Sequence, residues 1–312
     1  MSEIVRTSQG DLLSRTRDLA TLTEEELRRF AAQAARDRDT EALWALTEAH
    51  LTLHGAAGAN VSVHTLTAYR IGLRDLLKAW QGENLLRPRK NAGVLWVREL
   101  EGRFKPATVG VKLAAAKALY AALRWSGATE ISPFTDVKPA RDKTPAWAKR
   151  DAYSYVELEW LLRCAEGTNL LIVLLGAHAG LRVSEMTALR WEHVDLLNGV
   201  LTVKEGKGKK TAWVSLSQTL SEALEAVGQR EGFVLPCRAS QSVYERVESL
   251  CRRAKVRFKG VHALRHSSGT RLHEETGDIV LVADHLRHSS LDTARGYAKS
   301  NNTRVRKAVG GW

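Results

Sequence analysis

An arginine and a glutamate lie three residues apart just after a glycine, in the segment G-L-R-V-S-E at residues 180–185. On a helix this spacing brings the carboxylate of Glu185 within reach of the guanidinium of Arg182, and a buried arginine needs such a partner. A guanidinium presents a planar fork of donors that can bind phosphate oxygens in pairs. Taken alone, such a pair is more often structural than catalytic.

Two later segments add histidine, arginine and tyrosine. H-A-L-R at 262–265 puts His262 and Arg265 on one face of a predicted helix, and residues 288–297 place His288 in a turn before a helix that carries Tyr297. Each segment alone is weak evidence of chemistry. H-x-x-R arises by chance in an arginine-rich chain, and a single tyrosine on an apolar helical face usually belongs to the core.

The order and spacing of four segments together are far more specific. G-L-R-V-S-E is followed by G-K-G-K-K at 206–210, by H-A-L-R-H-S at 262–267 and by L-R-H-S-S-L-D-T-A-R-G-Y at 286–297. This arrangement resembles the tyrosine recombinase (phage integrase) family, and within it the compact Xer-type members that resolve chromosome dimers. The likeness covers the second half of the chain motif by motif. It extends more loosely to the first half, where Thr65 and Tyr69 lie on a basic helix.

The resemblance implies a catalytic set with one supporting carboxylate: Arg182, Lys207, His262, Arg265, His288 and Tyr297, supported by Glu185. In this assignment Tyr297 attacks a DNA phosphodiester and forms a 3′-phosphotyrosyl bond with release of a 5′-hydroxyl. Arg182, Arg265 and His288 hold the non-bridging oxygens. Lys207 protonates the leaving oxygen and His262 takes the tyrosine proton, while Glu185 orients Arg182. Phosphoryl transfer depends mostly on such positioning and charge.

The activity implied is that of a site-specific DNA recombinase that needs neither metal, ATP nor any other cofactor. It would act as a homotetramer on paired sites in double-stranded DNA, for chromosome dimer resolution or for integration of a mobile element. A second recombinase or an accessory protein remains open as a further partner. The rival functions are DNA relaxation of the type IB topoisomerase kind and a non-catalytic helix-turn-helix DNA reader.

One position departs from the family pattern, and the choice of the hairpin lysine has alternatives. Many members have a glycine just before the histidine of the last motif, where this chain has Arg287. That residue adds a cation close to the site, to contact either DNA or solvent. Lys207 is preferred as the hairpin lysine because glycines flank it, and Lys204, Lys209 and Lys210 are its rivals.

The net charge of +12 is distributed unevenly along the 312 residues. Residues 1–50 hold 7 basic and 10 acidic side chains, whereas residues 51–150 hold 17 basic and 7 acidic, and residues 151–312 hold 23 and 18. Two basic segments behind an acidic one suit a protein that grips a polyanion from two sides. The alternative is a basic protein that binds nothing in particular.

Helical spacing dominates the first half, at 24–36, 41–53, 62–81, 93–100 and 108–125. The helix at 62–81 places leucines on one face and cations on another, and Lys112 and Lys117 are predicted to point outward from 108–125. The residues that we expect to contact DNA lie here and at the hairpin tip: Arg70, Arg74, Lys78, Arg89, Lys90, Lys112, Lys209 and Lys210.

The second half mixes helices with one predicted β-hairpin, strands 199–204 and 211–216 around a lysine-rich tip. Helices are expected at 154–164, 169–178, 240–254, 262–274, 278–286 and 290–299. Proline-containing residues before this half lack apolar periodicity and predict a linker. We therefore expect an acidic helical extension (1–50), a helical core-binding DNA-binding domain (51–135), a linker (136–150) and an α+β catalytic domain (151–312), mainly α overall and arranged as a two-domain DNA clamp.

Composition excludes several other classes of protein. No apolar run approaches the roughly 18 residues of a membrane span, and the amino terminus lacks the pattern of a secretion signal. The three cysteines, Cys164, Cys237 and Cys251, lack the spacing of a zinc site and suit reduced thiols. These features predict a cytoplasmic, nucleoid-associated protein without a metal site or membrane contact.

Overall fold

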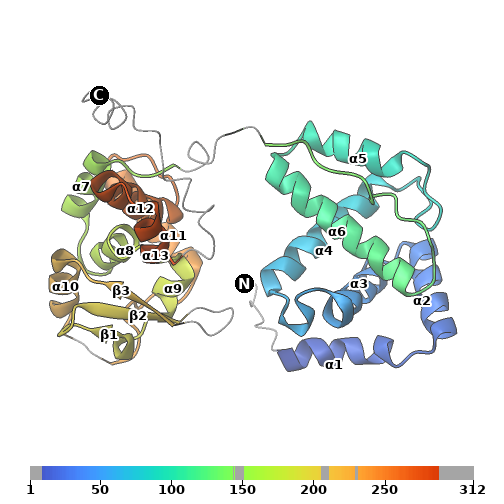
Figure 1. Cartoon of the computed structure of the whole chain (residues 1–312), viewed down its shortest axis with the longest axis horizontal. Helices are drawn as coiled ribbons and strands as arrows, with labels where there is room; N and C mark the ends of the chain where they lie inside the picture. The colour runs from blue at the N-terminus through green and yellow to red at the C-terminus, as the bar shows by residue number, and fades with distance from the viewer. Residues whose placement is uncertain (1–8, 143, 145–150, 205–210, 229–230, 288–312) are drawn as a thin grey trace, which may run out of the picture. The chain divides into compact units, whose positions relative to one another are not determined.

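The computed structural model describes residues 9–142, 144, 151–204, 211–228 and 231–287. The chain divides into two compact units, residues 1–143 and 144–312 (Figure 1). Each has its own hydrophobic core. In the described part of the chain, helices predominate and one small antiparallel sheet is present, which confirms the predicted fold class. None of the helices described is long and apolar enough to span a membrane.

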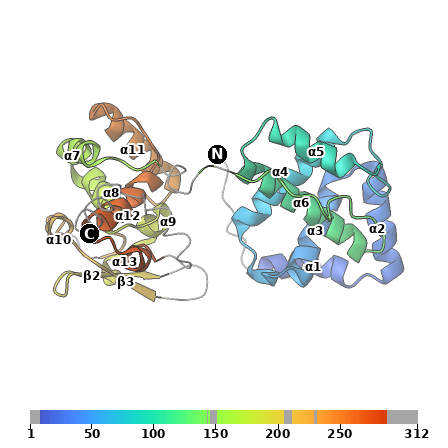
Figure 2. The ribbon, with the colours of Figure 1, turned by 45° about the horizontal axis from the view of Figure 1, so that its top comes forward.

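The first unit consists of helices in its described residues. They are α1 (Gln9–Ala20), α2 (Glu24–Asp37), α3 (Thr40–His54), the 3-10 turn η1 (Gly58–Asn60), α4 (Val63–Ala79), α5 (Ala92–Glu101) and α6 (Pro106–Trp125). Figure 2 shows the same helices from a second direction. Helix α6 packs against both α3 and α4. The predicted apolar face of α4 is confirmed, since Leu66, Leu73 and Leu76 are buried.

Helices α1 to α3 share the core of this unit, although the sequence sets residues 1–50 apart as an acidic extension. Leu43 and Leu46 of α3 are fully buried in the same cluster as the leucines of α4 and α6. The start of α2 is fixed by a capping box, in which the Thr23 hydroxyl accepts from the Glu26 N–H and the Glu26 carboxylate accepts from the Thr23 N–H. The described part of the acidic segment, residues 9–50, therefore forms one folded body with residues 63–125.

The segment after α6 also packs on the first unit. Phe134 is fully buried and stacks on Trp80, with ring centroids 5.5 Å apart. Val137 is buried as well, and its carbonyl accepts a hydrogen bond from Lys117 at 3.1 Å. Residues 136 and 137, assigned to a linker from the sequence, thus continue the first unit. Lys117 is not an outward cation as predicted, because its ammonium is used to hold this segment.

The second unit, in the residues for which the structure is described, combines helices with the sheet. Its helical elements are α7 (Tyr155–Cys164), α8 (Gly167–Ala177), α9 (Val183–Ala188), η2 (Trp191–His193), α10 (Gln218–Glu225), α11 (Ser240–Arg253), α12 (His262–Thr276) and α13 (Ile279–His285). The strands β1 (Val194–Asp195), β2 (Val200–Lys204) and β3 (Thr211–Ser215) form an antiparallel sheet in the order β1-β2-β3. Leu201 pairs with Val214, and both side chains are buried.

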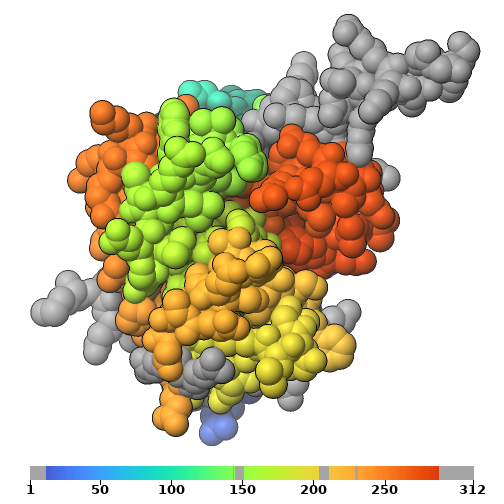
Figure 3. All heavy atoms as spheres, turned by 90° about the vertical axis from the view of Figure 1, so that its left-hand side faces the viewer, coloured from blue at the N-terminus to red at the C-terminus, as the bar shows by residue number. Residues whose placement is uncertain are grey.

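Helix α8 is the centre of this unit and explains why its sequence is almost entirely apolar. Its residues Leu171 to Ala177 are all buried, and α7, α10, α11 and α12 pack around it. In the space-filling view the red α12–α13 segment lies against the green α7–α8 segment (Figure 3). Gly176 on α8 permits this close packing, since an added Cβ would lie 2.7 Å from Leu264 Cβ.

Candidate active site

The loop between α8 and α9 presents Arg182 with its glutamate partner. Gly180 has a φ of +59°, and an added Cβ there would lie 2.6 Å from Leu286 Cδ2, so the position requires glycine. Two residues later Arg182 forms the N-cap of α9. Its Nη1 donates to Glu185 Oε1 at 2.6 Å, and its backbone N–H donates to Glu185 Oε2 at 2.8 Å. The predicted pair is present, and 38% of the Arg182 side chain remains exposed.

Arg265 reaches the same loop from α12. Its side chain is only 1% exposed, and its Nη1 and Nη2 donate to the backbone carbonyls of Gly180 and Leu286. The Arg265 Nη1 lies 3.9 Å from Glu185 Oε2. Folding therefore brings Arg182, Glu185 and Arg265 together from segments about eighty residues apart, and Arg265 ties α12 to both the α9 loop and the end of α13.

Arg287 is a third guanidinium in this cluster. Its Nη2 donates to Glu185 Oε2 at 2.9 Å and to the Gly180 carbonyl at 3.0 Å, and its Nη1 donates to the His285 carbonyl at 3.0 Å. The side chain is 3% exposed. The sequence interpretation, a contact with DNA or with solvent, is wrong for this structure, because the guanidinium is turned inward onto the Glu185 carboxylate, which is only 10% exposed. The contact could not be found from the sequence, since the two residues are 102 positions apart.

The charges around Glu185 keep it ionised. Burial of the carboxyl group opposes ionisation, but the Arg287 charge and then the hydrogen bonds from Arg182 hold the pKa of Glu185 below its usual value. Among the described residues, one carboxylate thus faces three guanidinium groups, and the formal charges of these four side chains sum to +2. Such an excess in a partly desolvated site favours an anion such as a phosphate.

His285 lies beside the cluster as a neutral imidazole. Its Nε2 is 2.8 Å from Ser268 Oγ on α12. Burial, together with the charges of Arg287 and Arg265, lowers the pKa of His285 from 6.5 to about 4. His285 lies in none of the four sequence segments that suggest chemistry. Its backbone carbonyl and its side chain both belong to the support of the cluster.

His262, the predicted acceptor of the tyrosine proton, is the first residue of α12 and is exposed. It lies one helical turn before Arg265, as the sequence predicts. Its ring makes an edge contact with His266, with centroids 4.5 Å apart. The remaining predicted catalytic residues, Lys207, His288 and Tyr297, lie outside the described residues, as do Lys209 and Lys210.

The predicted DNA-contacting residues of the first unit are mostly engaged in ion pairs. Arg70 and Arg74 on α4 both pair with Glu41 on α3. Arg89 pairs with Glu83 at 2.7 Å, although 85% of its side chain is exposed.

Lys112 pairs with Asp75 on α4, and its side chain is only 12% exposed. The prediction that Lys112 points outward is therefore wrong. Lys78 and Lys90 are exposed, as expected of residues that could meet a ligand.

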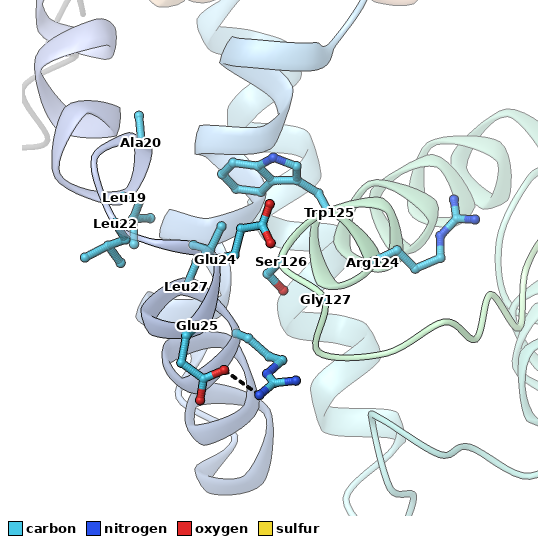
Figure 4. A pocket seen from close by; sticks show the side chains of 11 residues that line it. Leu19, Ala20, Leu22, Glu24, Glu25, Leu27, Arg124, Trp125, Ser126 and Gly127 are labelled. Atoms are coloured by element: carbon cyan, nitrogen blue, oxygen red, sulfur yellow. Dashed lines mark hydrogen bonds and ion pairs between the residues drawn. The ribbon is translucent and has the colours of Figure 1, made fainter.

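A cavity in the first unit has no histidine, cysteine or tyrosine in its lining. It measures about 740 Å³ and lies between the α1–α2 turn and the end of α6 (Figure 4). Apolar side chains, among them Leu19, Leu22 and Trp125, line it together with charged ones, and the Glu25–Arg28 ion pair lies at its edge. Among the described residues, histidine, cysteine and carboxylate side chains form no group of three or more that could hold a metal ion.

Comparison with known proteins places these features in a family. The chain matches the phage integrase family over residues 155–304 and the SAM-like N-terminal domain of phage integrases over residues 57–127. Tyrosine recombinase XerC of Xanthomonas campestris pv. campestris is 32% identical over 261 residues, which cover 76% of this chain and 79% of XerC. Tyrosine recombinase XerA of Thermococcus kodakarensis is 36% identical over 156 residues, which cover 44% of this chain and 53% of XerA.

Solved structures agree on the fold. The XerH site-specific recombinase in a post-cleavage complex with a palindromic difH substrate matches with a TM-score of 0.65 at 17% identity, over 98% of this chain and 97% of XerH. A lambda integrase dimer bound to a COC′ core site matches with a TM-score of 0.65 at 15% identity, over 86% of this chain and 77% of the integrase. Together with the XerC match across most of both chains, these findings show that the chain belongs to the phage integrase family of tyrosine recombinases.

Proposed function

We propose that this protein is a site-specific DNA recombinase that cuts and rejoins strands through a covalent bond to Tyr297. The observation that carries the proposal is the cluster at the α9 loop, where Arg182 and Arg265 converge on the carboxylate of Glu185, which is 10% exposed, and the described side chains carry an excess of positive charge. A phosphodiester gains charge on its non-bridging oxygens as it reacts, and fixed guanidinium groups stabilise that charge. These groups supply charge where other phosphoryl-transfer enzymes use metal ions.

The reaction balances without an external energy source. The Tyr297 oxygen attacks phosphorus and forms a P–O bond, while the bond from phosphorus to the 5′-oxygen breaks. His262 accepts the tyrosine proton, and Lys207 gives a proton to the 5′-oxygen, which leaves as a hydroxyl. Attack by a 5′-hydroxyl on the phosphotyrosyl bond reverses these steps, so the phosphodiester bond energy is conserved.

The proposal includes duplex DNA as ligand and a tetramer as the working assembly. The structural neighbours include a lambda integrase tetramer bound to a Holliday junction, with a TM-score of 0.66 at 15% identity. Four protomers on two duplexes supply one Tyr297 for each of the four strands that a full exchange requires. The exposed cations of the first unit, such as Lys78 and Lys90, would add phosphate contacts that position the protein without reading sequence.

The decisive experiment is detection of the covalent intermediate. Duplexes selected from a random library by binding to the protein would be nicked near the centre of the bound site, so that the short fragment released by cleavage diffuses away. We expect a DNA adduct that resists denaturant and is removed by protease with the wild type, and none with Tyr297→Phe. That variant should bind the duplex within about threefold of the wild type, because only a hydroxyl is removed.

Two results would contradict the proposal. An adduct that survives in Tyr297→Phe would move the nucleophile to another residue. A wild-type protein that relaxes supercoiled DNA, but never exchanges strands between two differently labelled duplexes carrying the selected site, would instead be a topoisomerase.

A further inference from the structure

Arg287 occupies a backbone conformation that L residues with a side chain rarely adopt. It follows Leu286, the C-cap of α13, and its φ is +53°. In this region the Cβ atom crowds the carbonyl oxygen that follows it, and glycine is the residue least affected. The chain nevertheless has arginine here, so the contacts of its side chain must compensate for an unfavourable backbone.

Those contacts join two segments that are distant in sequence. The Nη1 group donates to the His285 carbonyl at the end of α13, and the Nη2 group donates to the Gly180 carbonyl in the loop before α9. Because Gly180 also accepts from Arg265 Nη1, one carbonyl is shared by two guanidinium groups. The end of α13 is thereby fixed against the loop that carries Arg182.

The same Nη2 group completes the hydrogen bonds of Glu185. Oxygen Oε1 accepts from Arg182 Nη1, whereas Oε2 accepts from the Arg182 backbone N–H and from Arg287 Nη2. The carboxylate is therefore held from two sides, and its remaining freedom to rotate about the side-chain bonds is small. Arg182, with 38% of its side chain exposed, is the only one of the three arginines that presents a substantial surface.

Burial rules out the direct role for Arg287. A side chain that is 3% exposed cannot bind a DNA phosphate without first breaking three hydrogen bonds. We propose that Arg287 is a positioning residue, which holds Glu185 and the Gly180 carbonyl so that Glu185 aims Arg182 at the phosphate to be cleaved. This inference rests on the proposed function, because it assigns Arg287 a part in that same reaction.

The chain supplies a matched control in Arg38. This arginine also follows a helix in the left-handed conformation, with φ +55°, and donates to two backbone carbonyls, those of Leu77 and Glu83. It lies in the first unit and outside the cluster. Both variants lose a left-handed arginine and its hydrogen bonds to backbone carbonyls, but only Arg287→Gly also loses a contact with Glu185. Comparing the two therefore isolates the effect of that contact.

The test measures cleavage and binding separately, below the unfolding temperature of every variant. Arg287→Gly should reduce the rate of adduct formation by about tenfold or more, because a charged contact to the carboxylate is lost. Binding should stay within about threefold, because the buried residue makes no phosphate contact. Arg38→Gly should cleave at the wild-type rate. In a Glu185→Gln background, Arg287→Gly should slow cleavage by clearly less than in the wild type, since the two residues act through one contact.

A second readout does not depend on activity. With ¹⁵N-labelled arginine, restricted rotation of the Arg182 guanidinium should give separate Nη proton signals in the wild type and in Arg38→Gly, and averaged signals in Arg287→Gly. Unchanged cleavage and unchanged Arg182 signals in Arg287→Gly would overturn the inference, as would equal losses in both glycine variants. If the wild type forms no adduct while the Arg182 signals change as expected, the proposed reaction fails and the positioning of Arg182 by Arg287 stands.

Discussion

Arg182→Lys and Arg265→Lys are both expected to impair cleavage, yet only the second should destabilise the protein. A lysine retains the charge and loses the planar fork. At residue 265 two different nitrogens of the fork, Nη1 and Nη2, donate to the carbonyls of Gly180 and Leu286. A lysine has a single nitrogen at the end of its side chain and cannot keep both contacts. A buried polar group left without a partner costs about 1–3 kcal/mol.

The two positions differ in burial, which sets the size of each effect. For a unit of this length a loss of about 2 kcal/mol lowers Tm by roughly 4–8 °C, and this is the shift expected for Arg265→Lys, whose side chain is 1% exposed. Arg182 is 38% exposed, and a lysine there can keep one contact with Glu185. Arg182→Lys should therefore leave Tm within about 2 °C. Loss of a charged hydrogen bond to the reacting phosphate, worth about 1.5–3 kcal/mol, should slow cleavage roughly 10- to 150-fold.

Differential scanning calorimetry and single-turnover adduct formation on the same preparations would measure both quantities. The reasoning fails if Arg265→Lys melts at the wild-type temperature, because the carbonyl contacts would then contribute nothing. It also fails if Arg182→Lys cleaves at the wild-type rate, because its guanidinium would then have no part in holding the phosphate.

Three further predictions concern pH, metal ions and charge. The pKa of His285 is lowered to about 4 in the folded protein. The free energy of unfolding should therefore be highest above about pH 6.5 and fall by about 3 kcal/mol as the pH drops toward 4, because the unfolded chain then binds a proton that the folded protein does not. Chemical denaturation across this range should show a smaller fall in His285→Gln. Adduct formation should proceed at an unchanged rate in excess EDTA, and a strict Mg²⁺ requirement for cleavage would contradict the proposed use of guanidinium charge. Glu41→Gln should release Arg70 and Arg74 on α4, so the slope of log affinity for duplex DNA against log salt concentration should become steeper by about 1–2. The matched control is Glu25→Gln, which unpairs Arg28 and Arg29 on α2. Equal slopes in the two variants would show that the cations of α4 do not face DNA.

The sequence predicts the longer helices to within two or three residues because their ends carry local signals. Ser154 caps α7 with Glu157 at the third position, and both hydrogen bonds of the capping box are present. The hairpin is also correct, since β2 pairs with β3 and both strands alternate in burial over their described side chains, as a half-exposed sheet requires. No bounds were predicted for helices α1, α9 and α10, although the spacing of Arg182 and Glu185 already suggested a helix after Gly180. Of these, α9 has six residues and α10 has eight, too short for a periodic pattern to stand out.

The packing of the segment after α6 could not be predicted from the local sequence pattern. Phe134 and Val137 are isolated apolar residues near prolines, which is typical of a linker. Their burial depends on an aromatic surface assembled from distant helices, in which Trp80 comes from the end of α4 and Tyr120 from α6. The Tyr120 hydroxyl is in turn satisfied by the Leu85 carbonyl. A pattern confined to a few neighbouring residues carries no information about such a surface.

The candidate site shows the same division between chemistry and arrangement. The order and spacing of four sequence segments, through their resemblance to the tyrosine recombinase family, were enough to single out Arg182, Glu185 and Arg265. The role of Arg287 could not be found in this way, since nothing local distinguishes an arginine that turns inward from one that meets solvent. Its backbone is left-handed, and its guanidinium shares Glu185 Oε2 with the Arg182 backbone N–H, while the Arg182 guanidinium takes Oε1. A residue at a position that favours glycine has thus become part of the support of the site, and a sequence comparison that scores it only as a lost glycine would miss that role.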